Sequence, residues 1–138
     1  MAEMMVAAVI MILAFVGILA TFIRCLELNE LSRNTGIATT AAKARMELIK
    51  DTAFTDLATT YDKVPFFKTG FTGAGVSYVD TTDPNLYKIT VSFCFREKNG
   101  RVIGEDTNLN GVLNAGEDTN GNGMIDSPVE LATYIYHE

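Results

Sequence analysis

The chain has 138 residues and a formal net charge of −6, with 48% hydrophobic residues and two cysteines. This length is enough for one small domain with a single hydrophobic core beside any membrane segment. The charge balance is acidic and no basic patch interrupts it, which gives no support for nucleic-acid binding.

The N-terminal segment is the most apolar part of the chain. An uninterrupted apolar run covers residues 4–23, follows Glu3 and stops before Arg24. About 20 apolar residues is the length that a helix needs to cross a bilayer, so residues 1–23 are predicted to form a transmembrane or filament-core helix. A carboxylate at the edge of such a helix is costly without a cationic partner. The other interpretation is a plain uncleaved signal anchor with Glu3 in the headgroup region, since the run is too long for a cleaved signal peptide.

The helix is predicted to continue as an amphipathic helix over residues 24–53. This stretch contains no Pro, one Gly and many good helix formers. One face is defined by positions that recur every three or four residues, namely Leu28, Leu31, Thr35, Ala38, Ala42, Arg45 and Ile49, and a partly overlapping stripe by Leu31, Ala38, Ala41, Leu48 and Thr52. Such a face is expected to pack against a soluble domain.

Residues 54–138 are predicted to form a small β-rich head domain. Alternating apolar residues predict a strand over residues 86–96 and another over 129–136. Asn99-Gly100 is a strong hairpin signal, with residues 101–103 as the returning strand. Pro65 and Pro84 argue against long central strands in residues 55–85, and residues 70–75 are predicted to be a surface turn. The expected fold class is α+β, a long N-terminal helix packed against a small antiparallel sheet.

Catalytic chemistry finds little support in the sequence. The one histidine, His137, lies next to the C-terminal residue and is expected to be a solvated tail residue. No set of serine, histidine and aspartate, no zinc-ligand spacing and no phosphate-binding glycine loop is recognisable, so no enzymatic activity is predicted. Cys25 and Cys94 belong to different predicted elements, so both are expected to be small buried apolar residues and not a disulfide.

Between the last two predicted strands lies a tandem repeat. Residues 105–116 read EDTNLNGVLNAG, and residues 117–128 read EDTNGNGMIDSP. The first copy satisfies the calcium-loop pattern D-x-[DN]-x-[DN]-G-x5-E in full. Oxygen ligands are therefore expected from the side chains of positions 1, 3, 5, 9 and 12 and from the carbonyl of position 7, which are Asp106, Asn108, Asn110, Asn114, Glu117 and Val112.

The second copy follows the same pattern with one departure. Its expected ligands are Asp118, Asn120, Asn122, the Met124 carbonyl and Asp126. Position 12 is Val129, and the nearest acid is Glu130, one residue later, which is expected to close the loop after a local adjustment or to leave the site weaker. No flanking helices fit between the copies, so the loops are similar to those of dockerins and thrombospondin-type repeats.

A calcium-binding interpretation competes with an Asn/Gly-rich turn that binds nothing. Five acids would crowd together here without a cation, and a segment with almost no apolar side chains is not expected to be ordered by burial. Neutral Asn at several ligand positions favours weak affinity, roughly 10⁻⁴–10⁻³ M. One or two structural Ca²⁺ ions are therefore predicted in the insertion 105–128 of the head domain.

The N-terminal region resembles the bacterial type IV pilin and pseudopilin family. The similarity covers about residues 1–57 and rests on the segment EMMVAAVIMILAFVGILATFIRCLELNELSRN. The resemblance implies removal of a leader by a prepilin peptidase, handling by pilus assembly machinery, and pairing of Glu3 with the N-terminal amine of a neighbouring subunit. Family members carry this acid at the fifth mature position, whereas here it is third.

Two functions are therefore expected from the sequence. The first is a structural subunit that polymerises with copies of itself or related pilins through its apolar helix, lying in the inner membrane before assembly and then in an extracellular or periplasmic filament. The alternative is a membrane-tethered, extracytoplasmic calcium-binding interaction module that does not polymerise. A processed N-terminus a few residues before Glu3 would favour the first, and an uncleaved initiator Met the second.

Overall fold

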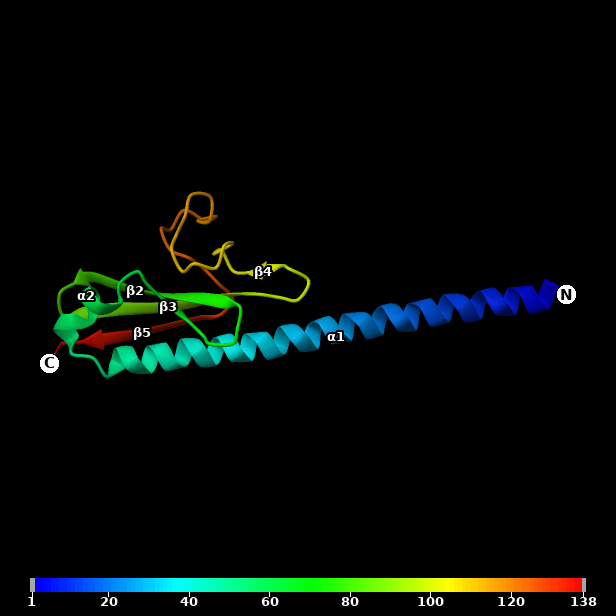
Figure 1. The fold of residues 1–138 in the computed structure, drawn as a ribbon, viewed down its shortest axis with the longest axis horizontal. Coiled ribbons are helices and arrows are strands. Elements are labelled where there is room, and N and C mark those ends of the chain that lie inside the picture. The colour runs from blue at the N-terminus through cyan, green and yellow to red at the C-terminus, as the bar shows by residue number, and fades with distance from the viewer. Residues whose placement is uncertain (1, 138) are drawn as a thin grey trace. The chain divides into compact units, whose positions relative to one another are not determined.

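The computed structural model describes residues 2–137, without the side chain of Ala2 (Figure 1). In chain order the elements are α1 (Ala2–Lys50), the 3₁₀ turn η1 (Phe54–Asp56), α2 (Leu57–Tyr61), β1 (Val64–Phe67), β2 (Gly73–Asp83), β3 (Leu86–Arg96), β4 (Val102–Ile103) and β5 (Glu130–Tyr136). Two compact units divide the chain, one reaching Arg33 and the other beginning at Asn34. The predicted α+β class is confirmed, with one long helix and an antiparallel sheet.

The first unit is helical throughout its described residues. The side chains of residues 3–29 are all exposed, and α1 is long and apolar enough, by length and composition, to cross a membrane. Cys25 is one of these exposed residues. The prediction that it is buried was wrong, because Cys25 lies on an exposed stretch of the first unit.

The part of α1 that belongs to the second unit has one buried face. Ala38, Ala42 and Ile49 are fully buried, as the three-to-four periodicity predicts. Two residues of the predicted apolar stripes are not buried: Leu28, in the first unit, is 65% exposed, and Leu48 is 58% exposed. Met46, 6% exposed, is a core residue that the predicted stripe did not include.

The sheet has five antiparallel strands in the order β1-β2-β3-β4, with β5 also paired to β3. Strand β3 has the predicted bounds, and β5 lies within the predicted C-terminal strand. The hairpin signal is also confirmed, since the Gly100 N–H bonds the Glu97 carbonyl at 3.0 Å and β4 then pairs with β3. Gly100 has φ +88°, a conformation that favours glycine.

The prediction of no long central strand in residues 55–85 was wrong. Strand β2 has eleven residues and pairs with both β1 and β3. The two prolines do not interrupt it, because Pro65 lies in β1 at the edge of the sheet and Pro84 lies in the turn after β2. The composition of this segment, rich in Gly, Thr and Asp, is not typical of a strand. Strand β2 is nevertheless buried on both faces over its first seven residues.

Residues 73–75 are also not a surface turn. Gly73 and Gly75 lie in β2, where added Cβ atoms would collide with neighbours. At Gly73 the Cβ would be 2.6 Å from the Cys94 carbonyl oxygen, and at Gly75 it would meet the Phe66 ring. These glycines therefore make room for aromatic side chains packed over the strand.

The two faces of the sheet bury different partners. Phe93 lies on the face where Phe66 and Phe71 pack, with ring centroids 5.6 and 6.2 Å away. The helix contacts this aromatic group, because the Arg45 guanidinium lies 5.2 Å from the centre of the Phe66 ring. The opposite face carries the segment between β4 and β5, so within the second unit the helix and this segment cover opposite sides of the sheet (Figure 1).

Candidate functional site

The first loop of the repeat is organised around Asp106, a buried residue that is 1% exposed. Its Oδ1 accepts the Asn110 N–H at 3.1 Å, and its Oδ2 accepts the Gly111 N–H at 2.7 Å. The Asn108 Oδ1 accepts the same Asn110 N–H at 3.0 Å. Gly111, at position 6, has φ +73°, which gives the sharp turn that the pattern requires. The side chains of positions 1 and 3 thus meet at the backbone of position 5.

Glu117 closes this first loop. Its Oε1 accepts the N–H and the hydroxyl of Thr107 at 3.0 and 2.8 Å, and its Oε2 accepts the Asn114 N–H at 3.0 Å. Burial opposes ionisation of this carboxyl, but the hydrogen bonds from Thr107 and Asn114 outweigh it and hold the pKa of Glu117 below its usual range. Position 12 therefore holds both the beginning and the end of the loop.

The position 9 side chain lies at the centre of the predicted ligand oxygens. The Asn114 Nδ2 is 2.7 Å from the Val112 carbonyl oxygen, 3.1 Å from the Glu117 Oε2 and 3.4 Å from the Asn110 Oδ1. An amide has only two N–H groups, so three oxygens compete for them. Oxygens from positions 5, 7 and 12 thus converge on one electropositive group, which is also what a bound cation requires of them.

The second loop repeats this backbone arrangement. The Asp118 Oδ1 accepts the Asn122 N–H at 3.1 Å and its Oδ2 accepts the Gly123 N–H at 2.9 Å. The amide nitrogens of Asn120 and Asn122 both donate to the Asp126 Oδ2. The predicted positions 1, 3, 5 and 9 of this copy are therefore also brought together. The N–H of Met124, at position 7, donates to the Asn122 Oδ1 at 2.8 Å.

The carboxylate that contacts the second loop is that of Glu105. Its Oε1 accepts the N–H and the hydroxyl of Thr119, and its Oε2 accepts the Asp126 N–H at 3.0 Å. Hydrogen bonding, first of all from the Thr119 hydroxyl, lowers the pKa of Glu105. Glu130, the residue expected from the sequence, is exposed in β5 and lies opposite Ser92. Glu105 lies before both loops in the sequence, whereas the calcium-loop pattern places the closing acid after the loop. The only signal is the repeated Glu-Asp-Thr-Asn at the start of each copy.

The repeat segment is acidic and contains no basic residue of its own. Residues 105–128 contain five acids and neither Lys nor Arg. Within residues 2–137, ion pairs join Arg24 to Glu27 and Arg101 to Glu97. Asp106 and Glu117 are therefore buried carboxylates stabilised by N–H and O–H donors, an arrangement that an added cation would stabilise further.

Neutral oxygens make up a large part of the donor set of each loop. Among residues 2–137 no three Asp, Glu, His or Cys side chains converge into a metal-holding group. A cation in the first loop would take most of its oxygens from Asn amides and a backbone carbonyl, and one in the second would take Asn120, Asn122 and the Met124 carbonyl beside its acids. Such oxygens suit Ca²⁺, and the low charge count favours weak binding.

The repeat segment also has an apolar anchor, which contradicts the expectation that burial could not order it. Ile125 is 1% exposed and packs with Val76, Tyr78 and Cys94 on the face of the sheet opposite Phe93. Three half-buried residues pack against the same cluster, namely Leu109, Leu113 and Met124. Each loop thus packs apolar side chains against the sheet, an arrangement that composition alone does not reveal.

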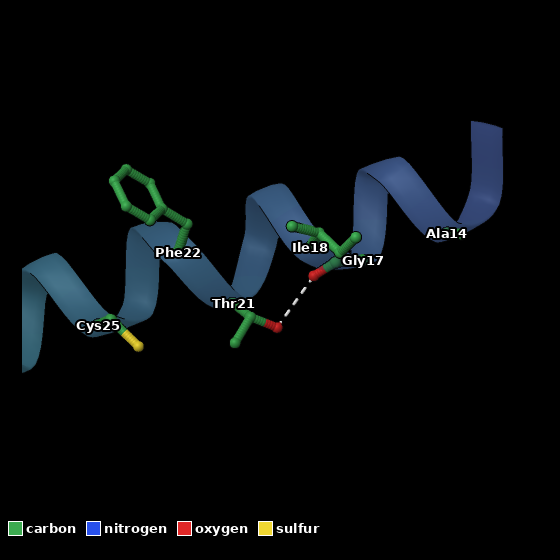
Figure 2. A pocket seen from close by; sticks show the side chains of 6 residues that line it. All are labelled: Ala14, Gly17, Ile18, Thr21, Phe22 and Cys25. Carbon is green, nitrogen blue, oxygen red and sulfur yellow. Dashed lines mark hydrogen bonds between the residues drawn. The ribbon is translucent and has the colours of Figure 1, made fainter. Parts of the chain in front are cut away.

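The membrane-type part of α1 carries a shallow hollow on one side (Figure 2). Small and apolar side chains line it, namely Ala14, Gly17, Ile18, Thr21, Phe22 and Cys25. The Thr21 hydroxyl donates to the Gly17 carbonyl at 2.9 Å, so its polar atom is satisfied within the helix. Glu3 is exposed in the first turn of the same helix.

Other singled-out residues have plain structural places. His137 is exposed at the end of the described chain, with its ring 4.9 Å from that of Phe54 in an edge contact. Cys94 is buried, as expected, and burial raises the pKa of its thiol.

Comparison with protein-family models finds no match, and comparisons with curated proteins and with solved structures also find none.

Proposed function

We propose that this protein is a structural subunit of a type IV pilus-like or pseudopilus-like filament, with a head domain that calcium stabilises. The observation that carries the proposal is the exposed apolar surface of α1. Large apolar side chains from Met4 to Ile23 are 45–79% exposed in the chain by itself. A surface of this kind is stable only in lipid or against other apolar helices.

Two features of α1 favour helix–helix assembly over a simple anchor. The hollow around Gly17 would let the backbone of another helix approach closely, as small residues do in membrane helix packing. Glu3, at the start of the apolar run, would be costly in hydrocarbon without a cation. The N-terminal amine of a neighbouring copy would supply that cation and fix the axial register, because apolar surfaces alone slide easily.

The loops support the calcium part of the proposal. Asp106, Asn108, Asn110, Asn114 and Glu117 with the Val112 carbonyl would hold one ion, and Asp118, Asn120, Asn122 and Asp126 with the Met124 carbonyl a second. Bound calcium would supply positive charge to the five acids of a segment that contains neither Lys nor Arg, and would so order the connection between β4 and β5. A structural role follows, since binding to the folded state alone stabilises it.

Electron microscopy of material sheared from cells, combined with mass spectrometry of the subunit's N-terminus, tests the filament. Helical filaments built from a leader-processed chain are the expected result. Unprocessed protein confined to the membrane fraction, with no filaments, would instead favour a membrane-tethered calcium-binding module, which the exposed helix and the loops would also serve.

Thermal unfolding of the full chain in detergent micelles tests the calcium sites. Calcium should raise the melting temperature and a chelator should reverse the effect. The double variant Asp106→Ala with Asp118→Ala should lose this shift, because position 1 of both loops is removed. Asp83→Ala, at the exposed end of β2, is the matched control and should keep it. A calcium shift that persists in the double variant would exclude these loops as the site.

A further inference from the structure

We infer that the two loops of the repeat close each other, with Glu117 completing the first and Glu105 completing the second. The inference rests on the proposed calcium binding and adds a ligand-side residue, Glu105, and a coupling between the two sites. Its basis is a complete calcium-loop pattern in one copy, a nearly complete one in the other, and matching contacts in both.

The contacts of the two glutamates correspond atom by atom. The Glu117 Oε1 accepts the N–H of Thr107, position 2 of the first loop, at 3.0 Å, and the Glu105 Oε1 accepts that of Thr119, position 2 of the second, at 3.1 Å. The Oε2 atoms accept the N–H of position 9, Asn114 or Asp126, both at 3.0 Å. Glu105 therefore occupies in the second loop the place that position 12 occupies in the first.

The backbone repeats the same reciprocity. The Glu117 N–H donates to the Asn114 carbonyl at 3.1 Å, and the Glu105 N–H donates to the Asp126 carbonyl at 2.9 Å. Each glutamate thus bonds position 9 of its loop through both its backbone and its side chain. Glu117 also directly precedes Asp118, so it begins the second copy while it closes the first.

The consequence is that each closing glutamate directly precedes position 1 of the other loop, so the two loops are not independent. Glu105 directly precedes Asp106 of the first loop, yet its side chain holds the second. The chain enters Glu105 through Gly104, where an added Cβ would collide with the Cys94 Sγ, so this entry is fixed against the sheet. Ordering one loop by calcium therefore positions the closing carboxylate of the other, which is positive coupling between the sites.

Calcium titration of the full chain in micelles by isothermal calorimetry tests the assignment. Two ions are expected to bind the unaltered chain. Glu105→Gln should weaken one site at least about tenfold, in the range seen when a supporting group of a metal site is lost, and should reduce the coupling. Glu130→Gln is the matched control and should bind as the unaltered chain does. Weakening by Glu130→Gln with no effect of Glu105→Gln would overturn the inference.

Hydrogen exchange in the presence of a chelator gives a readout that needs no metal. Glu105→Ala should speed exchange at the Thr119 and Asp126 amides more than at those of Thr107 and Asn114, and Glu117→Ala should do the reverse. Equal effects on both loops would overturn the reciprocal arrangement. If the unaltered chain binds no calcium while the exchange pattern holds, the proposed calcium function fails and the closure by Glu105 stands as a structural contact.

Discussion

The Tyr78 hydroxyl oxygen accepts the backbone N–H of Ile125 at 2.8 Å, joining strand β2 to the second loop of the repeat. The two residues are 7% and 1% exposed, so this hydrogen bond is shielded from water. It fixes the backbone directly before Asp126, the position 9 residue of that loop. Strand β2 thereby fixes the position of the loop that forms the second candidate metal site.

Tyr78→Phe should lower the free energy of unfolding by about 1–3 kcal/mol. The change keeps the ring but leaves a buried N–H without its acceptor, and the cost of such an unsatisfied group has this size. Chemical denaturation of the full chain in micelles measures it. Tyr134→Phe is the control, because Tyr134 is 62% exposed and its loss of a hydroxyl should cost little. Equal effects of both changes would contradict the role given to Tyr78.

The same residue should make stability depend on pH in the alkaline range. Burial raises the pKa of Tyr78 above its ordinary value of 10.0, although the Ile125 N–H acts in the opposite direction. Below pH 10 the Tyr78 hydroxyl is neutral in both the folded and the unfolded state, so its full contribution to stability is present. Above pH 10 this hydroxyl ionises first in the unfolded state, and the contribution is lost as the pH rises through the folded-state pKa. The stability difference between the unaltered chain and Tyr78→Phe should therefore shrink from pH 9 to 11, as melting curves would show.

Gly75→Ala should destabilise the head domain by about 1–3 kcal/mol, the usual cost of overpacking a core. The added methyl group would collide with the Phe66 ring and lie 2.7 Å from the Phe93 Cδ2. Gly36→Ala is the matched control, since it lies in α1 with nothing within 4 Å of its Cβ position. That change should stabilise the helix by up to about 1 kcal/mol. A neutral Gly75→Ala would show that Phe66 can move aside.

Glu3→Ala should leave the subunit folded in the membrane and abolish most filament formation. Without the carboxylate, neighbouring apolar helices lose the charge pair that we propose sets their register. Glu27→Ala is the control, because Glu27 lies further along α1 and forms a largely exposed ion pair with Arg24 at 2.8 Å, worth about 1 kcal/mol or less. Electron microscopy with quantified sheared protein measures the yield. Normal filament yield in Glu3→Ala would exclude the register role.

The sequence by itself determined the elements whose signals are local. The helix from Ala2 to Lys50, the strand β3 and the Asn99-Gly100 hairpin follow from hydrophobic periodicity and turn chemistry, which depend on neighbours in the chain. The side chains that each loop brings together also follow from a local signal, because the calcium-loop pattern is contained within twelve consecutive residues.

Only the tertiary structure decided the features that depend on segments far apart in the chain. Strand β2 is central because β1 and β3 flank it, and its glycines are needed because aromatic rings from other strands pack over them. The anchoring of Ile125 under Tyr78 joins residues 47 positions apart. Glu105 contacts Thr119 across 14 positions, whereas Glu130, closer to the pattern, lies in β5. Side-chain contacts of this kind are set by the packing of the sheet and loops, which spacing along the chain does not encode.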